Sequence, residues 1–428
     1  MHLIPVLLLV LSVLVSGGVS ASPLTDAEAL LRAGKLSEAR ARLQSLSPAT
    51  AADAERRDWA LAVTHVRSGA PKLAVPLLDR LVSSRPGDGR YRLELGMALL
   101  RSGASGRARH HLDLVRGARG LDPQTRAGLD AVLRRIEAPR LWEGYLRFAL
   151  VPESNAVRRT GADSLFIGGD RIVLNPNARA MPATGLQLDG GFAFLPRLGP
   201  DLRGRIGLRS DVRFYEKSQL NDVTLKAETG IEGTTRSGAH WVVVGTLSRR
   251  DVGNTAYSRG HGVRVGWASR VGQAGHLRLR AEHETLRHRG AWRLNGPRSL
   301  LALTYSQVLA PNLLMHGTVF ANRARPRIAS ENADGLGVVM GLQYGFAGGL
   351  VVDLDLALGR SDRRGVDRLF GVVRHDTRTG VTARIKHRDL RLSGFTPVLE
   401  MGHERQKSTI ALNSYRNTRL SLGLSRDF

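Results

Sequence analysis

Two pairs of adjacent ionisable residues are the first candidates for chemistry in this sequence. They are His375 with Asp376 and His403 with Glu404. A histidine beside a carboxylate can serve as a general base when both side chains reach the same reacting group. Both pairs, however, lie in segments that alternate like β-strands, where neighbouring side chains point to opposite faces. Neither pair therefore predicts a catalytic dyad.

The other residue patterns that carry chemistry are missing from the sequence. There is no Ser-His-acid set, no histidine cluster with metal-ligand spacing and no glycine-rich phosphate loop. The chain has no cysteine, which excludes a disulfide framework, a thiolate metal site and a lipid anchor on cysteine. We therefore predict no catalytic residue, no metal and no cofactor. A hydrolase assembled from distant strands is the alternative that the sequence leaves open.

The charged residues that do form a pattern are arginines that alternate with apolar residues. In the segment 202–214, leucine, isoleucine, valine and phenylalanine occupy even positions, whereas arginine and aspartate occupy odd positions. Similar segments recur from Thr184 to Phe428, and this alternation predicts strands with one apolar and one polar face. We expect the polar faces to line a lumen. The basic residues predicted to face it are Arg203, Arg205, Arg209, Arg213, Arg278 and Arg280.

The length of these segments favours a transmembrane barrel. They run for about 9–12 residues, whereas an ordinary strand has about 5–6 and a tilted membrane-spanning strand about 9–11. An outer-membrane barrel is apolar outside and polar inside, as these two faces require. A large soluble all-β domain is the alternative. With the helical front end described below, the sequence predicts an α+β multidomain chain.

The number of strands is harder to predict than their nature. We identify fifteen candidates, but a bacterial single-chain barrel has an even number. We therefore predict fourteen strands and regard the region 366–389 as the place where one candidate is wrong. The candidates are residues 144–151, 184–195, 201–214, 222–232, 239–249, 260–270, 274–285, 297–308, 312–323, 335–346, 349–360, 366–375, 380–389, 395–405 and 417–428.

The connections between these segments fall into two classes. Residues 195–200, 309–312 and 346–349 form tight turns rich in proline and glycine, which we predict to be periplasmic. The stretch from Pro152 to Pro182 is far longer. We predict that it is a surface loop or a plug, because long loops often carry function.

The first residues predict a secretory signal peptide over residues 1–21. An apolar run covers residues 3–16, and Val19 and Ala21 provide a small-residue cleavage site. This run is too short to cross a membrane as a helix, and no other run approaches the required length. A membrane protein without a helical span must cross as a barrel.

Residues 22–140 have a different period from the strands. Gly34, Gly69 and Gly103 are spaced 35 and 34 residues apart, and an alanine follows each glycine by five residues. A period of 34 residues is typical of tetratricopeptide repeats, which pair two helices in each repeat. We predict two or three repeats and a closing helix from Pro123 to Glu137, with a generic helical bundle as the alternative. The residues predicted to pack the repeats are Gly34, Ala39, Gly69, Ala74, Gly96, Gly103 and Ala108.

Both predicted domains are basic. The formal net charge is +25, with 21 basic and 13 acidic residues in 22–140, and 42 and 25 in 141–428. Because the charge is spread over both parts, there is no separate basic tail of the kind that binds nucleic acid, and we predict no nucleic-acid partner. An inward surplus of arginine would attract acidic cargo. Genome composition and anionic lipopolysaccharide explain the same surplus equally well.

Several short motifs stand out in the predicted barrel. Their residues are Pro152, Ser154, Asn155, Arg374, Asp376, Gly394, Phe395, Pro397, Tyr415, Arg426 and Phe428. Together they resemble the motifs of the surface lipoprotein assembly modulators (Slam). Members of that family have a periplasmic tetratricopeptide domain followed by a fourteen-strand outer-membrane barrel, in the same order as here. The terminal phenylalanine also resembles the signal that such barrels present to the barrel assembly machinery. The chain departs from the family at residues 156–157, 409 and 413.

The resemblance implies a translocation function. The helical domain, residues 22–140, would collect an exported cargo protein in the periplasm, and the barrel, residues 141–428, would help to pass it to the cell surface. The cargo would be a surface lipoprotein or a soluble relative, and the other partners would be outer-membrane lipid and the assembly machinery. A polysaccharide export porin with periplasmic repeats and a simple uptake barrel are the alternatives.

Overall fold

The computed structural model describes residues 22–118, 121–136, 141–167, 170–388 and 390–428. The predicted signal peptide, residues 1–21, lies outside the described residues, and so does the end of the predicted helical domain at residue 140, so both stay predictions. The chain divides into two compact units, one that reaches to Leu77 and one from Leu78 to Phe428. None of the described helices is long and apolar enough to cross a membrane.

Seven helices occupy the N-terminal part of the described chain. Left-handed glycines join them in pairs, because Gly34, Gly69 and Gly103 have φ angles of 77°, 77° and 83°, a conformation that favours glycine. These are the three glycines that the repeat pattern singled out. The helices are α1 (Pro23–Arg32), α2 (Leu36–Ser45), α3 (Ala51–Arg67), α4 (Pro71–Ser84), α5 (Gly89–Arg101), α6 (Ser105–Arg116) and α7 (Pro123–Ile136).

Small residues let these helices pack closely. Ala39, Ala74 and Ala108 are completely buried. A Cβ atom at Gly96 would lie 2.6 Å from Cδ2 of Leu112, so α5 and α6 require a glycine there. The apolar cores follow from the same pattern. Leu24, Ala27, Leu43 and Ala60 form one core in the first unit, and Leu112, Val115, Leu129 and Leu133 form another in the second unit.

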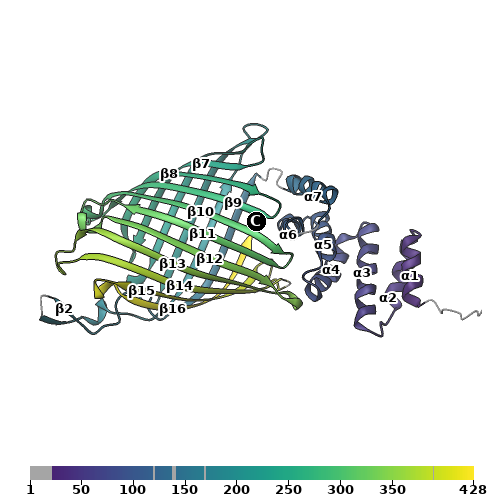
Figure 1. Cartoon of the computed structure of the whole chain (residues 1–428), viewed down its shortest axis with the longest axis horizontal. Helices are drawn as coiled ribbons and strands as arrows, with labels where there is room; N and C mark the ends of the chain where they lie inside the picture. The colour runs from purple at the N-terminus through teal and green to yellow at the C-terminus, as the bar shows by residue number, and fades with distance from the viewer. Residues whose placement is uncertain (1–21, 119–120, 137–140, 168–169, 389) are drawn as a thin grey trace, which may run out of the picture. The chain divides into compact units, whose positions relative to one another are not determined.

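Fourteen antiparallel strands close into a barrel in the second unit (Figure 1). The ring runs in chain order and closes where β1 pairs with β16. Two further strands, β2 (Ser164–Ile167) and β3 (Asp170–Val173), form a separate hairpin. The barrel strands are β1 (Trp142–Glu153), β4 (Ala183–Phe194), β5 (Leu202–Tyr215), β6 (Asp222–Thr234), β7 (His240–Val252), β8 (Thr255–Val271), β9 (Gly275–His288), β10 (Gly296–Ala310), β11 (Leu313–Ala324), β12 (Ala333–Gly345), β13 (Leu350–Val366), β14 (Val373–His387), β15 (Thr396–Ser408) and β16 (Tyr415–Asp427).

The predicted count of fourteen strands is confirmed, and the extra candidate lay in the doubtful region. Residues 366–375 and 380–389 are not two strands. β13 continues to Val366, a short loop follows, and β14 covers Val373–His387. The strands contain 12 to 17 residues, which is longer than expected from the alternation alone.

The apolar face of each strand is on the outside of the barrel. Leu208 and Leu356, at two well-separated places on the wall, are 52% and 55% exposed. The arginines that alternate with them in β5 make ion pairs with carboxylates of other strands inside the barrel. Turning an arginine outward at the bilayer midplane would cost about 2–4 kcal/mol. This cost fixes the register of the wall, because a shift by one residue would reverse every face.

The two ends of the barrel differ in their connections. The end with Trp142 and Phe428, here called the terminal end, carries the three tight turns predicted from the sequence. The opposite end, here called the loop end, carries residues 154–182 and the β2–β3 hairpin (Figure 1). Aromatic rings gather at the terminal end, where Trp142 lies 5.0 Å from Phe192 and 4.4 Å from Phe194 between ring centroids. Aromatic rings of this kind mark the interfacial girdle of an outer-membrane barrel.

Candidate functional site at the barrel seam

The seam where β1 meets β16 is the most weakly paired part of the wall. Only seven residue pairs join these strands, whereas β1 and β4 are joined by twelve. Pairing runs without a break from Tyr145↔Asp427 to Leu150↔Leu422 and then skips two positions. Pro152 lies in this gap, and proline has no backbone N–H to donate to a ladder. The proline motif predicted from the sequence therefore marks the interruption in the seam.

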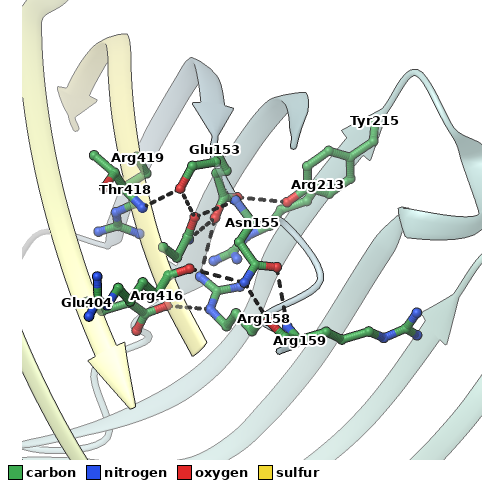
Figure 2. A network of polar contacts seen from close by, with 12 residues as sticks. Glu153, Asn155, Arg158, Arg159, Arg213, Tyr215, Glu404, Arg416, Thr418 and Arg419 are labelled. Carbon is green, nitrogen blue, oxygen red and sulfur yellow. Dashed lines mark hydrogen bonds and ion pairs between the residues drawn. The ribbon is translucent and has the colours of Figure 1, made fainter. Parts of the chain in front are cut away.

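Backbone and side-chain hydrogen bonds together continue the seam at the loop end. Ser154 N donates to Thr418 O at 2.9 Å, and Thr418 N donates back to Ser154 Oγ at 2.8 Å. Asn155 N donates to Asn417 Oδ1 at 2.9 Å. Asn417 Nδ2 donates in turn to Glu153 Oε2 at 2.7 Å. We call Glu153, Ser154, Asn155, Asn417 and Thr418 the seam clasp (Figure 2).

Glu153 is the charged centre of the seam clasp. Its side chain is only 3% exposed, so the carboxylate depends on protein donors. Besides Asn417, Tyr215 Oη donates to Oε1 at 2.9 Å and Arg158 Nη2 to Oε2 at 3.5 Å (Figure 2). Tyr215 reaches the seam from β5 across β4, where a Cβ at Gly185 would lie 2.8 Å from the tyrosine ring. The clasp therefore involves four neighbouring strands of the wall.

The clasp also holds the start of the long loop against the barrel. Arg158 has a φ of 51°, which is unusual for a residue other than glycine, and its Nε donates to Glu404 Oε1 at 2.6 Å. Asn155 Nδ2 donates to the carbonyl oxygen of Arg159 at 2.8 Å. A pocket of about 180 Å³ borders this contact and is lined by Arg158, Glu404 and Arg419 among others. The first turn of the loop is thus fixed by the same residues that close the seam.

Further along the lumen, the inward arginines form ion pairs. Arg205 contacts Glu228, Glu232 and Glu143 at 2.6, 2.8 and 2.5 Å. Glu228 also forms ion pairs with Arg209 at 2.8 Å and with Arg264 at 2.7 Å. The remaining predicted residues pair as follows: Arg203 with Glu232 at 2.8 Å, Arg213 with Asp211 at 3.8 Å, and Arg280 with Glu282 at 2.7 Å; Arg278 has no ion pair among the described residues. The lumen is therefore lined by both signs of charge, not by arginine alone.

One lumenal cluster has the residue types of a metal site. The ligand atoms of His316, Asp353 and Asp355 lie within 4.8 Å of one another. Arg384 Nη1, however, lies 2.9 Å from Asp353 Oδ1 and 3.0 Å from Asp355 Oδ2. Because this guanidinium bridges both carboxylates, we assign the cluster to the lumenal ion-pair network.

The two candidate dyads are separated by the strand geometry, as predicted. His375 Nδ1 contacts Asp362 at 2.7 Å, whereas Asp376 pairs with Arg374 at 2.8 Å. His403 Nδ1 lies 2.8 Å from Thr418 Oγ1 on one face of β15. Glu404 on the other face binds the loop residue described above. Neither histidine contacts the carboxylate next to it in sequence.

The structure places the motif residues on the seam and on the two strands that follow it in the ring. Pro152 lies near the end of β1, Ser154 and Asn155 directly follow β1, and Tyr415 begins β16. At the terminal end, Phe395 lies 5.6 Å from Phe148, and the Arg426 guanidinium lies 5.7 Å from the Phe395 ring and 4.8 Å from the Phe428 ring. Gly394, with a φ of 85°, and Pro397 form the turn into β15, and Arg374 and Asp376 lie on β14. All these residues belong to β1, β14, β15, β16 and their connections.

Sequence reasoning missed half of the seam clasp. Ser154 and Asn155 are among the predicted motif residues, whereas Glu153, Asn417 and Thr418 are not. Asn155 and Asn417 are 262 residues apart, so only the closure of the barrel brings them together. The signal that could have found them is the polar, inward position of Asn417 on the last strand, opposite the end of the first.

Comparison with known proteins agrees with this geometry. A model of the surface lipoprotein assembly modifier family matches residues 142–428, which is the whole barrel. This chain belongs to the surface lipoprotein assembly modifier family. The match confirms the resemblance found in the sequence, and the closed barrel with its apolar exterior places this family member in the outer membrane. Its family and fold are those of an assembly barrel and not of an enzyme class.

Solved structures similar to this family member are also outer-membrane proteins, at low identity. OccK1 (OpdK) of Pseudomonas aeruginosa is 11% identical, with a TM-score of 0.35 and coverage of 67% of this chain and 99% of that one. The channel DcaP of Acinetobacter baumannii is 10% identical, with a TM-score of 0.41 and coverage of 67% and 96%. The P. putida toluene transporter TodX is 11% identical, with a TM-score of 0.37 and coverage of 68% and 91%. Among curated proteins, none matches this chain.

Proposed function

We propose that this protein passes a surface lipoprotein, or a related secreted protein, from the periplasm to the cell surface. The family match over the entire barrel carries the proposal, since it assigns the membrane-spanning part to surface lipoprotein assembly. In this function the loop end faces the outside and the terminal end faces the periplasm. Bacterial barrels have short periplasmic turns and longer extracellular loops, which supports this orientation.

The lumen supports passage of a polypeptide better than binding of one small ligand. Its wall carries paired charges, such as Arg205 with Glu228. An unfolded segment would therefore meet both hydrogen-bond donors and acceptors, and both positive and negative side chains. Weak, repeated contacts suit transit, because a segment that binds tightly at one place would not leave it. The polar wall also excludes apolar chains, which matters for a cargo that carries a lipid.

The helical part, residues 22–140, would hold the cargo before transit. Paired helices stack into curved surfaces that bind peptides and partner proteins. The left-handed glycines and the buried alanines build such pairs here. We place this part in the periplasm, because it precedes a barrel whose first strand begins at the terminal end.

The test uses a surface lipoprotein that carries an epitope tag and is expressed together with this chain. Cells that express both proteins should expose the tag to antibody on intact cells, and cells without this chain should not. A variant that lacks residues 22–140 but keeps the signal peptide should still assemble a heat-modifiable barrel and expose far less cargo. Equal exposure with and without the full chain would overturn the proposal. Export of a polysaccharide in the same cells would support the alternative porin function.

A further inference from the structure

We propose that the β1–β16 seam is a lateral exit that opens from the loop end, with the seam clasp as its latch. This inference rests on the proposed function, because it concerns a cargo with a lipid anchor. It assigns a role to residues that neither the lumen nor the helical part explains. The partner that fits the opened seam is a polypeptide whose acyl chains remain in the surrounding hydrocarbon.

The chemistry of such a cargo requires a lateral opening. Acyl chains are stable in the hydrocarbon core of the membrane and not against a wall of ion pairs. A polypeptide, by contrast, needs polar partners and would follow the lumen. A lipoprotein can satisfy both demands only where the wall parts along a line from lumen to lipid.

The β1–β16 seam is the line where the wall parts most easily. It has seven residue pairs, while each other pair of neighbouring strands has at least ten. Its ladder is interrupted at Val151 and Pro152, toward the loop end, and resumes only with the pair Glu153↔Arg419. Since the strength of a seam grows with the number of its hydrogen bonds, this one has the lowest barrier to separation.

Side chains on both faces of the seam suit separation. On the lumen side, a Cβ at Gly423 would lie 2.6 Å from Phe148 O and 2.7 Å from the Cβ of Ala149, so no larger side chain interlocks the strands there. On the lipid side, Leu150 and Leu422 are 54% and 63% exposed. When the strands part, these leucine side chains stay against acyl chains, so the cost of parting comes from the backbone hydrogen bonds of the short ladder and not from the side chains.

The seam clasp supplies the control that the short ladder lacks. Its hydrogen bonds lie at the loop end, where water can replace them when the strands part. The terminal end of the seam stays anchored, because Phe428 N donates to Gly144 O at 2.8 Å and the Arg426 guanidinium covers the Phe428 ring. The geometry thus predicts opening at one end and a hinge at the other.

Disulfide crosslinking tests this in a chain without native cysteine. Leu422 pairs directly with Leu150 on one side and with Leu399 on the other. The test variant is Leu150→Cys with Leu422→Cys, and the control is Leu399→Cys with Leu422→Cys. Direct partners in antiparallel strands lie about 4.5–5.5 Å apart between Cα atoms, within the range of a disulfide. Each crosslink is confirmed by gel mobility with and without reductant.

The readout is surface exposure of the epitope-tagged lipoprotein in cells that express the full chain. We expect the oxidised Leu150–Leu422 crosslink to reduce exposure at least tenfold, with recovery after reduction, while the oxidised Leu399–Leu422 crosslink leaves it unchanged. Normal exposure in the oxidised test variant would overturn the lateral exit. If that variant fails to assemble, Phe148→Cys with Leu424→Cys crosslinks the same seam two residues nearer the terminal end. Absence of exposure even with the wild-type chain would overturn the proposed function instead, and this inference with it.

Discussion

Replacing Asn417 with alanine should loosen the seam more than any other single truncation of comparable size. Asn417 is 2% exposed and connects both sides of the clasp, since it donates to Glu153 and accepts from the backbone of Asn155. A hydrogen bond to a charged group contributes about 1.5–3 kcal/mol, and a buried N–H left without a partner costs about 1–3 kcal/mol. Together the truncation should cost about 3–5 kcal/mol, or two to four powers of ten in the seam-opening equilibrium.

The measurement is urea unfolding of the purified barrel in detergent micelles, scored by the fraction that keeps folded mobility on a semi-native gel. Asn322→Ala is the matched control. Asn322 also faces the lumen near the loop end, but it lies on β11, is exposed and has no described hydrogen bond. We expect its unfolding midpoint to stay within error of wild type. If Asn417→Ala shifts the free energy of unfolding no more than Asn322→Ala, the clasp does not hold the seam.

Three further predictions concern the wall and the helices. Leu208→Cys should react with lipid-soluble probes and Arg209→Cys with water-soluble ones; the opposite pattern would reverse the face assignment. Gly341→Ala should cost about 1–3 kcal/mol of barrel stability, because the added Cβ would clash with the side chains of His316 on β11 and Asp355 on β13. Gly359→Ala should not reduce stability in this way, because there is room for a Cβ at that position. Burial, then nearby positive charge, lowers the pKa of His65, so helical thermal stability should fall as the pH drops below about 6.5, and His65→Gln should flatten that dependence.

Most of the barrel could be predicted from the sequence, because one physical requirement governs each strand. Lipid on one side of a strand and water on the other require side-chain polarity to alternate with a period of two. The sequence therefore predicts the two faces of β5. The prediction of two strands in the region 366–389 was wrong, because the loop after β13 interrupts the alternation close to the end of that long strand. Strand ends were also underestimated: beyond the bilayer, strands continue on backbone hydrogen bonds without an apolar face to mark them.

The charges of the lumen could be placed but not paired. Alternation predicts that Arg205 points inward, but it does not indicate that its partners lie on other strands. Gly230 is the residue opposite Arg205, and Glu228 and Glu232 lie diagonally on either side of it. Such diagonal neighbours depend on register, which a single sequence fixes only loosely. The sequence alone predicts a basic wall, whereas the structure shows a network of ion pairs. Replacing Arg205 with an acidic residue would bring several carboxylates together without a counter-charge.

The seam clasp was the least predictable part, since its halves are at opposite ends of the barrel sequence. A short motif around Pro152 marked one half, but no local rule indicates that Asn417 completes it. Hydrogen bonds of this kind follow from closure, in the same way that an active site follows from a fold. The motif indicates one half of the clasp, and the structure shows the hydrogen bonds that join it to the other half.

The energetics of a lipid anchor connect that role to the family's function. Each CH₂ group buried in hydrocarbon contributes about 0.8 kcal/mol, so one chain of about 16 carbons loses roughly 12 kcal/mol on entering a polar lumen. Parting the seam also has a cost, which is lowest where the ladder is shortest and where water can replace the broken hydrogen bonds. A barrel that delivers a lipid-anchored protein is therefore expected to part its wall and keep the acyl chains in the membrane. The interrupted ladder beside Pro152 is where this wall can part at the lowest cost.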